Sequence, residues 1–307
     1  MAYDSRSDRI LLFGGHTGGS LFTVVNDTWA YDYNTNAWTN LNPPVSPSPR
    51  AEHAMAYDSR SDRIILFGGG TADYPYFSDE TWSYDVDTNT WTNLSSFAAP
   101  AARIYHAIAF DVLSDRVVLF GGFSTELRAT NDTWAYEYNT NTWTNLSPTV
   151  SPYPRTDHAM AYDSRADRII LFGGGIDVRQ VDNETWAYDP NANIWVEIHP
   201  ATAPPPRSGH SMAYDAGSDR IIMFGGSVYG TADPAETWSY HARAPSPSIP
   251  LPLLAASVAA TVVLALVVLL FWYWRTKGRK TEGSGPDQGH PPDAQRRGDP
   301  PRSRVRG

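Results

Sequence analysis

Four histidines recur at regular intervals and could, by residue type, form a metal site. His53, His106, His158 and His210 are separated by 53, 52 and 52 residues, and imidazole is the commonest metal ligand in proteins. Each histidine follows an arginine by three positions, so it belongs to a repeated Arg-x-x-His element. A residue that recurs with its neighbours is better explained by a structural role. We therefore interpret these histidines as orienting the chain where it enters each repeat, and we expect no metal ligands.

Paired aspartates also recur and could suggest calcium. The pattern Asp-x-x-x-Asp-Arg begins at Asp4, Asp58, Asp111, Asp163 and Asp215. It lacks the Asp-x-Asp-x-Asp-Gly spacing of a calcium loop. Aspartate side chains frequently accept hydrogen bonds within tight turns, so we expect these residues to cap turns and not to bind calcium. We expect no cofactor.

No arrangement of residues indicates catalysis. The chain has no cysteine, which excludes thiolate metal sites, cysteine nucleophiles and disulfides. Neither a Gly-x-Ser-x-Gly elbow nor a phosphate-binding glycine loop occurs. We therefore predict no catalytic residues and expect a protein that is not an enzyme.

Charge and composition narrow the class of partner. Aromatic residues make up 13% of the 307 residues and charged residues 19%, which is typical of a chain that can bury a core. Residues 1–248 contain 15 arginines, no lysine and 29 acidic residues, whereas residues 275–307 contain 9 basic and 4 acidic residues. An acidic globular part is a poor partner for phosphate backbones, so we expect no nucleic acid.

The chain is built from a repeat of 52 to 54 residues. The recurring histidines and aspartates belong to this repeat, so the fold of the repeat sets their positions. Two consecutive glycines recur at Gly14, Gly68, Gly121, Gly173 and Gly225, and a Thr-Trp pair follows at Trp29, Trp82, Trp134, Trp186 and Trp238. In the first four copies a second tryptophan follows nine residues later, at Trp38, Trp91, Trp143 and Trp195. Correlated marks at one period indicate a repeat architecture.

Each repeat predicts four short strands. In the second copy these are residues 53–58, 63–67, 80–84 and 91–94, with alternating side chains and turn residues between them. The two glycines after the second strand indicate a positive φ or a close backbone approach. A single sheet of this size buries too little surface to be stable, so we expect the copies to pack against each other.

This pattern resembles the kelch motif: a basic residue and a histidine before the first strand, two glycines after the second, and an aromatic third strand nine residues before a tryptophan. The resemblance covers residues 1–241 and implies an all-β, kelch-type β-propeller of five four-stranded blade units. The Trp-Asp dipeptide of WD repeats and the sialidase box do not occur. Some kelch-like propellers are galactose oxidases with a Tyr-Cys copper cofactor, which this chain cannot form because it has no cysteine.

The first and last copies are incomplete in sequence. The first lacks the basic residue and the histidine, and the last stops at Tyr240 before a fourth strand. We expect the chain to be a fragment of a longer protein whose upstream part holds further blade material and a signal peptide. A five-blade ring and an open arc are both compatible with the sequence.

The C-terminal region predicts a membrane anchor. After the propeller (1–243) and a proline-containing linker (244–252), residues 253–274 are predominantly apolar and uncharged, long enough as a helix to span a bilayer. A basic cluster begins the tail (275–307), so the positive-inside rule places the tail in the cytoplasm and the propeller outside. The rival topology is a tail-anchored protein with a cytosolic propeller.

The loops between the second and third strands differ most between copies and carry the candidate ligand-binding residues. Variable loops on a rigid repeat are frequent binding sites, although unconstrained drift predicts the same variation. The candidates are Tyr74, Tyr76, Phe77 and Phe123. We expect a protein or glycan ligand at the cell surface, and the lipid bilayer as partner of the helix. The alternative function is a propeller hydrolase, lyase or epimerase acting on surface sugars.

Overall fold

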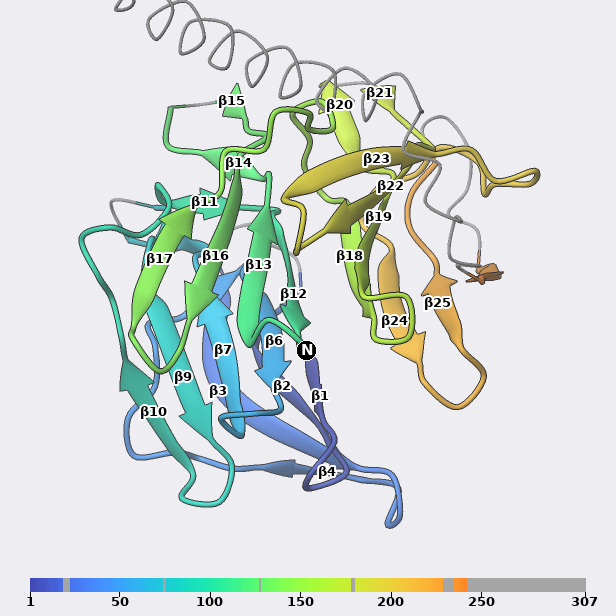
Figure 1. Ribbon diagram of the computed structural model, residues 1–307. Coiled ribbons are helices and arrows are strands. Elements are labelled where there is room, and N and C mark those ends of the chain that lie inside the picture. Colours follow the sequence, from blue (N-terminus) through green and yellow to red (C-terminus); the bar gives the residue numbers. More distant parts are fainter. Residues whose placement is uncertain (19–22, 74–75, 127, 178–179, 229–234, 242–307) are drawn as a thin grey trace, which may run out of the picture. The chain divides into compact units, whose positions relative to one another are not determined.

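The computed structural model describes residues 1–18, 23–73, 76–126, 128–177, 180–228 and 235–241 (Figure 1). These residues form antiparallel strands and turns, and no helix occurs among them. The all-β prediction is therefore confirmed for this part of the chain. Consequently, the described residues include no helix able to cross a membrane. The predicted linker, the predicted spanning segment 253–274 and the predicted tail lie outside the described residues.

Five antiparallel sheets follow one another along the chain, and we call them blades 1 to 5. Blade 1 contains β1 (Ala2–Asp4), β2 (Arg9–His16), β3 (Val24–Asp32) and β4 (Ala37–Asn40). Blade 2 contains β6 (Ala54–Asp58), β7 (Arg63–Phe67), β9 (Thr81–Asp85) and β10 (Thr90–Asn93). Blade 3 contains β12 (Ala107–Asp111), β13 (Arg116–Phe120), β16 (Thr133–Glu137) and β17 (Thr142–Asn145). Blade 4 contains β18 (Ala159–Asp163), β19 (Arg168–Phe172), β22 (Thr185–Asp189) and β23 (Ile194–Ile198). Blade 5 contains β24 (Ser211–Asp215), β25 (Arg220–Phe224) and β26 (Thr237–Tyr240).

The first strand of each blade is the innermost. Neighbouring blades contact each other mainly through these strands, in the order β1, β6, β12, β18 and β24. Each blade then continues outward in sequence order. Blade 1 forms all four strands although its sequence lacks the Arg-x-x-His element, whereas blade 5 has three strands among the described residues. The predicted second-copy strand at 63–67 coincides with β7. The predicted strand at 53–58 begins one residue before β6, and the predicted strands at 80–84 and 91–94 are each shifted by one residue from β9 and β10.

The hydrophobic core lies between blades. In β7, Ile64 to Phe67 are fully buried on both faces of the sheet. Ile64 and Leu66 cluster with Leu11 and Phe13 of blade 1, while the alternate residues of β7 cluster with blade 3. The expectation that each sheet gains its core by packing on the next copy is therefore confirmed.

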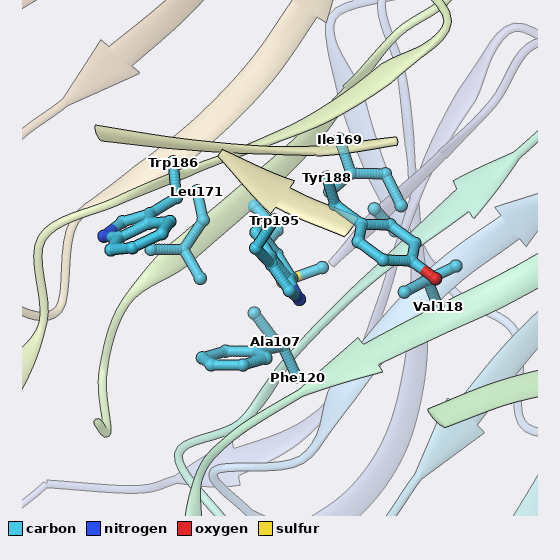
Figure 2. Packing of buried hydrophobic residues seen from close by; sticks show 10 residues of the cluster. Ala107, Val118, Phe120, Ile169, Leu171, Trp186, Tyr188 and Trp195 are labelled. Carbon is cyan, nitrogen blue, oxygen red and sulfur yellow. The ribbon is translucent and has the colours of Figure 1, made fainter. Parts of the chain in front are cut away.

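One tryptophan bonds each of blades 2, 3 and 4 to the blade before it. Trp195 of β23 lies with its ring centroid 4.9 Å from that of Phe120 in blade 3, and its Nε1 donates to Thr133 Oγ1 at 3.0 Å. Figure 2 shows Trp195 above Phe120 and Ala107. The same contact joins Trp91 to Phe13 and Thr28, and Trp143 to Phe67 and Thr81. We call this repeated contact the tryptophan junction.

The recurring aspartates cap the turn between the first and second strands. Asp58 Oδ1 accepts from the backbone N–H groups of Arg60 and Ser61, both at 3.0 Å. The second aspartate of the pattern, Asp62, has a φ of 57° and accepts from the Tyr57 hydroxyl at 2.8 Å. The predicted turn role of these residues is thus confirmed.

Short additional strands form in the loops outside the four predicted strands of each repeat. β5 (Arg50–Ala51) pairs with β8 (Gly70–Thr71), and β20 (Gly175–Asp177) pairs with β21 (Gln180–Val181). β14 (Phe123–Ser124) lies between β11 (Arg103–Ile104) and β15 (Arg128–Ala129). In Figure 1, β14, β15, β20 and β21 lie at the upper end of the sheets. We call this end of blades 1 to 5, which carries the loops from second to third strands, the loop face.

Candidate binding site on the loop face

A buried arginine holds together the segments that meet at the loop face of each complete repeat. Arg50, Arg103, Arg155 and Arg207 are all at most 1% exposed. Arg103 Nη1 donates to Gly121 O at 2.9 Å, Nε donates to Ala101 O at 3.0 Å, and the guanidinium makes a bidentate pair with Asp132. One side chain therefore ties the incoming loop to the end of the second strand and the start of the third.

The paired glycines allow this close packing. Gly121 and Gly122 have φ values of 63° and 99°. A Cβ at Gly121 would lie 2.9 Å from Arg155 O of the next blade, and one at Gly122 would lie 2.7 Å from His106 Cβ. The prediction of positive φ and close approach after the second strand is confirmed at this pair.

The histidines of the Arg-x-x-His element pack between blades. The His106 ring lies edge-on to Phe67 of blade 2 with centroids 5.5 Å apart, and His158 and His210 repeat this contact with Phe120 and Phe172. Burial, with a smaller contribution from the Arg103 charge, lowers the pKa of His106 to about 3. The packing of these neutral rings between blades supports the structural role that we predicted.

The residues before these histidines are linked by a series of backbone hydrogen bonds. Tyr105 N–H donates to Glu52 O at 3.1 Å, Asp157 N–H to Tyr105 O at 2.9 Å, and Gly209 N–H to Asp157 O at 2.8 Å. All four residues have φ between 54° and 67°. Each directly precedes the segment that enters an innermost strand. This series of hydrogen bonds therefore brings together one side chain from each of blades 2, 3 and 4 on the inner part of the loop face.

These side chains form a polar cluster with altered acidity. Glu52 Oε1 lies 2.6 Å from His16 Nε2 and accepts from the Tyr105 hydroxyl at 3.3 Å. Burial and the nearby charge of Glu52 raise the pKa of Asp157 to about 6, although a hydrogen bond from Thr156 opposes the shift. Burial, followed by the charges of Glu52 and Asp157, raises the pKa of Tyr105 to about 12. The cluster can accept hydrogen bonds and attract positive charge.

A cavity of about 270 Å³ opens beside this cluster. Its walls combine Glu52 and Tyr105 with Tyr76, Phe77, His16 and Ile104. Aromatic and aliphatic walls around a few polar groups are typical of a ligand site. The cavity thus joins the central polar cluster to the variable loop of blade 2.

The structure places three of the four predicted ligand-binding residues. Tyr76 is 53% exposed with a φ of 62°, and both Tyr76 and Phe77 line the cavity. Phe123 in β14 lies edge-on to Phe77 with centroids 6.3 Å apart. Tyr74 lies outside the described residues. The three placed aromatics therefore lie close together, across the boundary between blades 2 and 3.

The central residues Glu52, Tyr105 and Asp157 were not among the predicted site residues. A feature of the sequence could have identified them, because the position before the repeated histidine changes from Glu to Tyr, Asp and Gly while its neighbours recur. Variation at one position inside a constant element marks a side chain that the fold itself does not require.

Serial four-stranded sheets with buried arginines, paired glycines and tryptophan junctions define kelch-type propeller blades. Over residues 2–226 and 148–246 the chain matches the KLHDC2/KLHL20/DRC7 Kelch-repeats domain family, and it belongs to this family.

Curated relatives agree with this assignment. The chain is 30% identical over 180 residues to Kelch domain-containing protein 10 of Xenopus tropicalis, covering 56% of the chain and 41% of the relative. It is 27% identical to Mei4-dependent protein 6 of Schizosaccharomyces pombe, covering 59% and 29%. It is 27% identical to Multiple epidermal growth factor-like domains protein 8 of Mus musculus, covering 70% and 8%. The chain therefore spans less than half the length of each of these relatives.

Proposed function

We propose that residues 1–243 are a non-enzymatic binding or scaffold module that recognises a protein or glycan through the loop face. The observation that carries this proposal is the cavity where Tyr76 and Phe77 meet the polar groups of Glu52 and Tyr105. Kelch-repeat domains generally mediate protein–protein interactions, which favours a protein ligand. The polar cluster would fix the ligand's orientation, and the aromatic rings would supply contact area at low entropic cost.

Alanine substitution of the cavity aromatics is expected to weaken binding by at least tenfold, because removing a central aromatic from an interface commonly costs about 2 kcal/mol. The variants are Tyr76→Ala and Phe77→Ala in the full chain, solubilised in detergent and applied to arrays of glycans and surface proteins. The matched control is Tyr33→Ala, since Tyr33 is 76% exposed in the turn between β3 and β4. Unchanged array binding by both cavity variants would refute the loop-face proposal.

A propeller enzyme acting on surface sugars is the second candidate, favoured by one observation. Asp157, whose pKa is raised to about 6, lies near Glu52 and Tyr105 in the central cluster. A carboxyl group that titrates near neutral pH is suited to acid or base catalysis. Incubation of the array glycans with the chain separates the two functions. A hydrolase or lyase changes their mass in mass spectrometry and an epimerase changes their configuration in NMR spectra, whereas a binding module changes neither.

We further propose that the module is displayed at the cell surface by a single membrane-spanning segment, residues 253–274, with the tail 275–307 in the cytoplasm. The support is the run of apolar residues followed by Arg275, Lys277, Arg279 and Lys280. Protease added to intact cells is expected to remove the propeller and to spare a tag placed after Gly307. Loss of the tag with survival of the propeller would establish the tail-anchored topology instead.

A further inference from the structure

The cavity on the loop face contains a carboxylate oxygen that has no hydrogen-bond partner among the described residues. Glu52 forms its two side-chain hydrogen bonds, with His16 Nε2 and with the Tyr105 hydroxyl, through Oε1. Neither of these bonds uses Oε2. Glu52, His16 and Tyr105 all line the cavity, and the Glu52 side chain is 19% exposed. The second oxygen of this largely buried carboxylate is therefore available to a ligand.

Gly70 keeps the space beside this oxygen open. A Cβ at Gly70 would lie 2.9 Å from Glu52 Oε2, 3.5 Å from Ile104 Cγ2 and 3.7 Å from Tyr76 O. These three residues and Gly70 itself line the same cavity. Gly70 is not among the glycines with a positive φ, so its backbone conformation does not require glycine. A side chain at this position would instead fill the part of the cavity next to Glu52.

Two tyrosines with a left-handed backbone conformation contribute to the wall of the cavity. Tyr76 has a φ of 62° and Tyr105 a φ of 58°, which is uncommon for bulky residues. Tyr76 is held in this conformation because its N–H donates to Asp73 O at 2.8 Å and its carbonyl accepts from Thr71 N–H at 2.7 Å. Such conformations cluster at binding sites, where the surrounding structure fixes a side chain. With Phe77, they give the cavity three aromatic rings beside one carboxylate.

The charges around the cavity favour a positively charged ligand. Among the described residues, neither arginine nor lysine lines it. Asp73 and Asp79, in the variable loop of blade 2, are exposed. Arg50, which enters the same loop region, is buried and paired with Glu80, so its charge is compensated inside the fold. Fields of one sign raise the local concentration of ligands of the opposite sign.

We propose that the loop face recognises a protein partner through an arginine side chain, whose guanidinium enters this cavity and donates a hydrogen bond to Glu52 Oε2. The inference rests on the proposed binding function and names the chemistry of its ligand. The flat guanidinium would stack on the ring of Tyr76 or Phe77, a contact between a cation and an aromatic face.

Arginine fits this cavity better than lysine or a sugar. A guanidinium is more weakly hydrated than an ammonium group, so it loses less when it enters walls that include Ile104 and Val24. At about 270 Å³, the cavity is smaller than the roughly 300 to 1,000 Å³ of pockets that enclose a small molecule. One side chain of a larger partner therefore suits it. A neutral sugar would leave the charge of Glu52 without a counter-charge.

The test is binding of the full chain, in a nonionic detergent, to arrays of peptide pools. Each pool has one fixed central residue, either arginine, lysine or citrulline, and uncharged residues at the other positions. Citrulline has nearly the shape of arginine without its charge. The unsubstituted chain is expected to bind the arginine pool at least tenfold more tightly than the citrulline pool, and more tightly than the lysine pool.

Glu52→Gln is expected to weaken binding of the arginine pool at least tenfold, because removing one partner of a desolvated charged hydrogen bond commonly has an effect of this size. The matched control is Glu126→Gln, which removes the same charge from a side chain that is 62% exposed and does not line this cavity. Gly70→Ala should weaken binding without changing any charge. Its control is Gly175→Ala, because Gly175 is the equivalent residue of blade 4. Unchanged circular dichroism would show that the variants fold.

The outcomes distinguish this inference from the binding function on which it rests. Array binding that is lost in Tyr76→Ala but unchanged in Glu52→Gln overturns the arginine and leaves the loop-face function intact. Array binding that is unchanged in Tyr76→Ala, Phe77→Ala and Glu52→Gln overturns both. Equal binding of the arginine and citrulline pools, or of the arginine and lysine pools, also overturns the proposal, since the cavity would then not select a guanidinium.

Discussion

Replacing Arg103 by leucine is expected to lower the free energy of unfolding by about 3 to 5 kcal/mol, the usual effect of removing one partner of a buried ion pair. The guanidinium is 1% exposed and satisfies Asp132 and the Gly121 carbonyl. Burial alone would raise the pKa of Asp132, but the hydrogen bonds and charge of Arg103 outweigh it and hold that pKa below its usual value. Without the arginine, the carboxylate stays partly buried with its main partner gone.

Urea unfolding of the full chain in detergent, followed by far-UV circular dichroism, measures this loss. The matched control is Arg128→Leu, because Arg128 is 71% exposed and its pair with Glu126 is on the surface, where such pairs contribute roughly 0 to 1 kcal/mol. Arg103→Lys should fall between the two, since lysine keeps the charge but cannot make the bidentate contact. A loss below 1 kcal/mol for Arg103→Leu would show that the arginine does not organise the loop face.

Lowering the pH from 7 to 4 is expected to destabilise the propeller by several kcal/mol. Burial lowers the pKa of His106 to about 3 and that of His210 to about 4, and it lowers the pKa of His158 strongly. Because these pKa values lie below those of the unfolded chain, protons bind preferentially to the unfolded state. Their contribution to stability is complete above pH 6.5 and is lost as the pH falls toward the folded values. One pKa unit corresponds to about 1.4 kcal/mol, so His106 alone accounts for roughly 3 kcal/mol by pH 4.

Carboxyl groups whose pKa is raised act in the opposite direction over the same range. Burial raises the pKa of Asp157 and of Asp182 to about 6, so their protonation favours the folded state as the pH falls. The histidines are expected to dominate because they are more numerous and their shifts are larger. Unfolding free energies at pH 7, 5.5 and 4 measure the net effect, and His106→Gln should reduce the pH dependence. Equal stability at pH 7 and pH 4 would contradict the assignment of buried, neutral histidines.

The sequence predicted those parts of the fold that are carried by repetition. β7 was located to the residue because Ile64 to Phe67 lie between a turn aspartate and two glycines, which limit the strand on both sides. The role of the second tryptophan of each repeat is harder to predict from the sequence, because the residues that it contacts lie in the preceding blade. Trp195, for example, bonds Thr133, which is 62 residues away. Period alone does not specify which side chains meet across two copies.

The sequence predicts the candidate site only in part, for two physical reasons. β5 and β8 have two residues each, too few to show the alternation by which strands are identified. The series of backbone hydrogen bonds through Glu52 and Tyr105 depends on a positive φ at non-glycine residues, a conformation that residue type alone does not predict. The aromatic candidates Tyr76 and Phe77 were found because the loop varies between copies and carries large side chains.

The tryptophan junction also bears on how a protein of this kind can change in length. Each junction takes a phenylalanine and a threonine from one blade and a tryptophan from the next, and the bonded residues are 62 or 63 positions apart. Duplication of one whole repeat of 52 residues inserts a blade whose two new junctions have the same partners as the old one. A duplication of half a repeat would instead change the spacing between the two partners of the junction that spans it, so that this tryptophan would lack a correctly placed acceptor. The architecture therefore accepts gains and losses of chain only in whole blades, and the number of blades can evolve while the contacts between them stay the same.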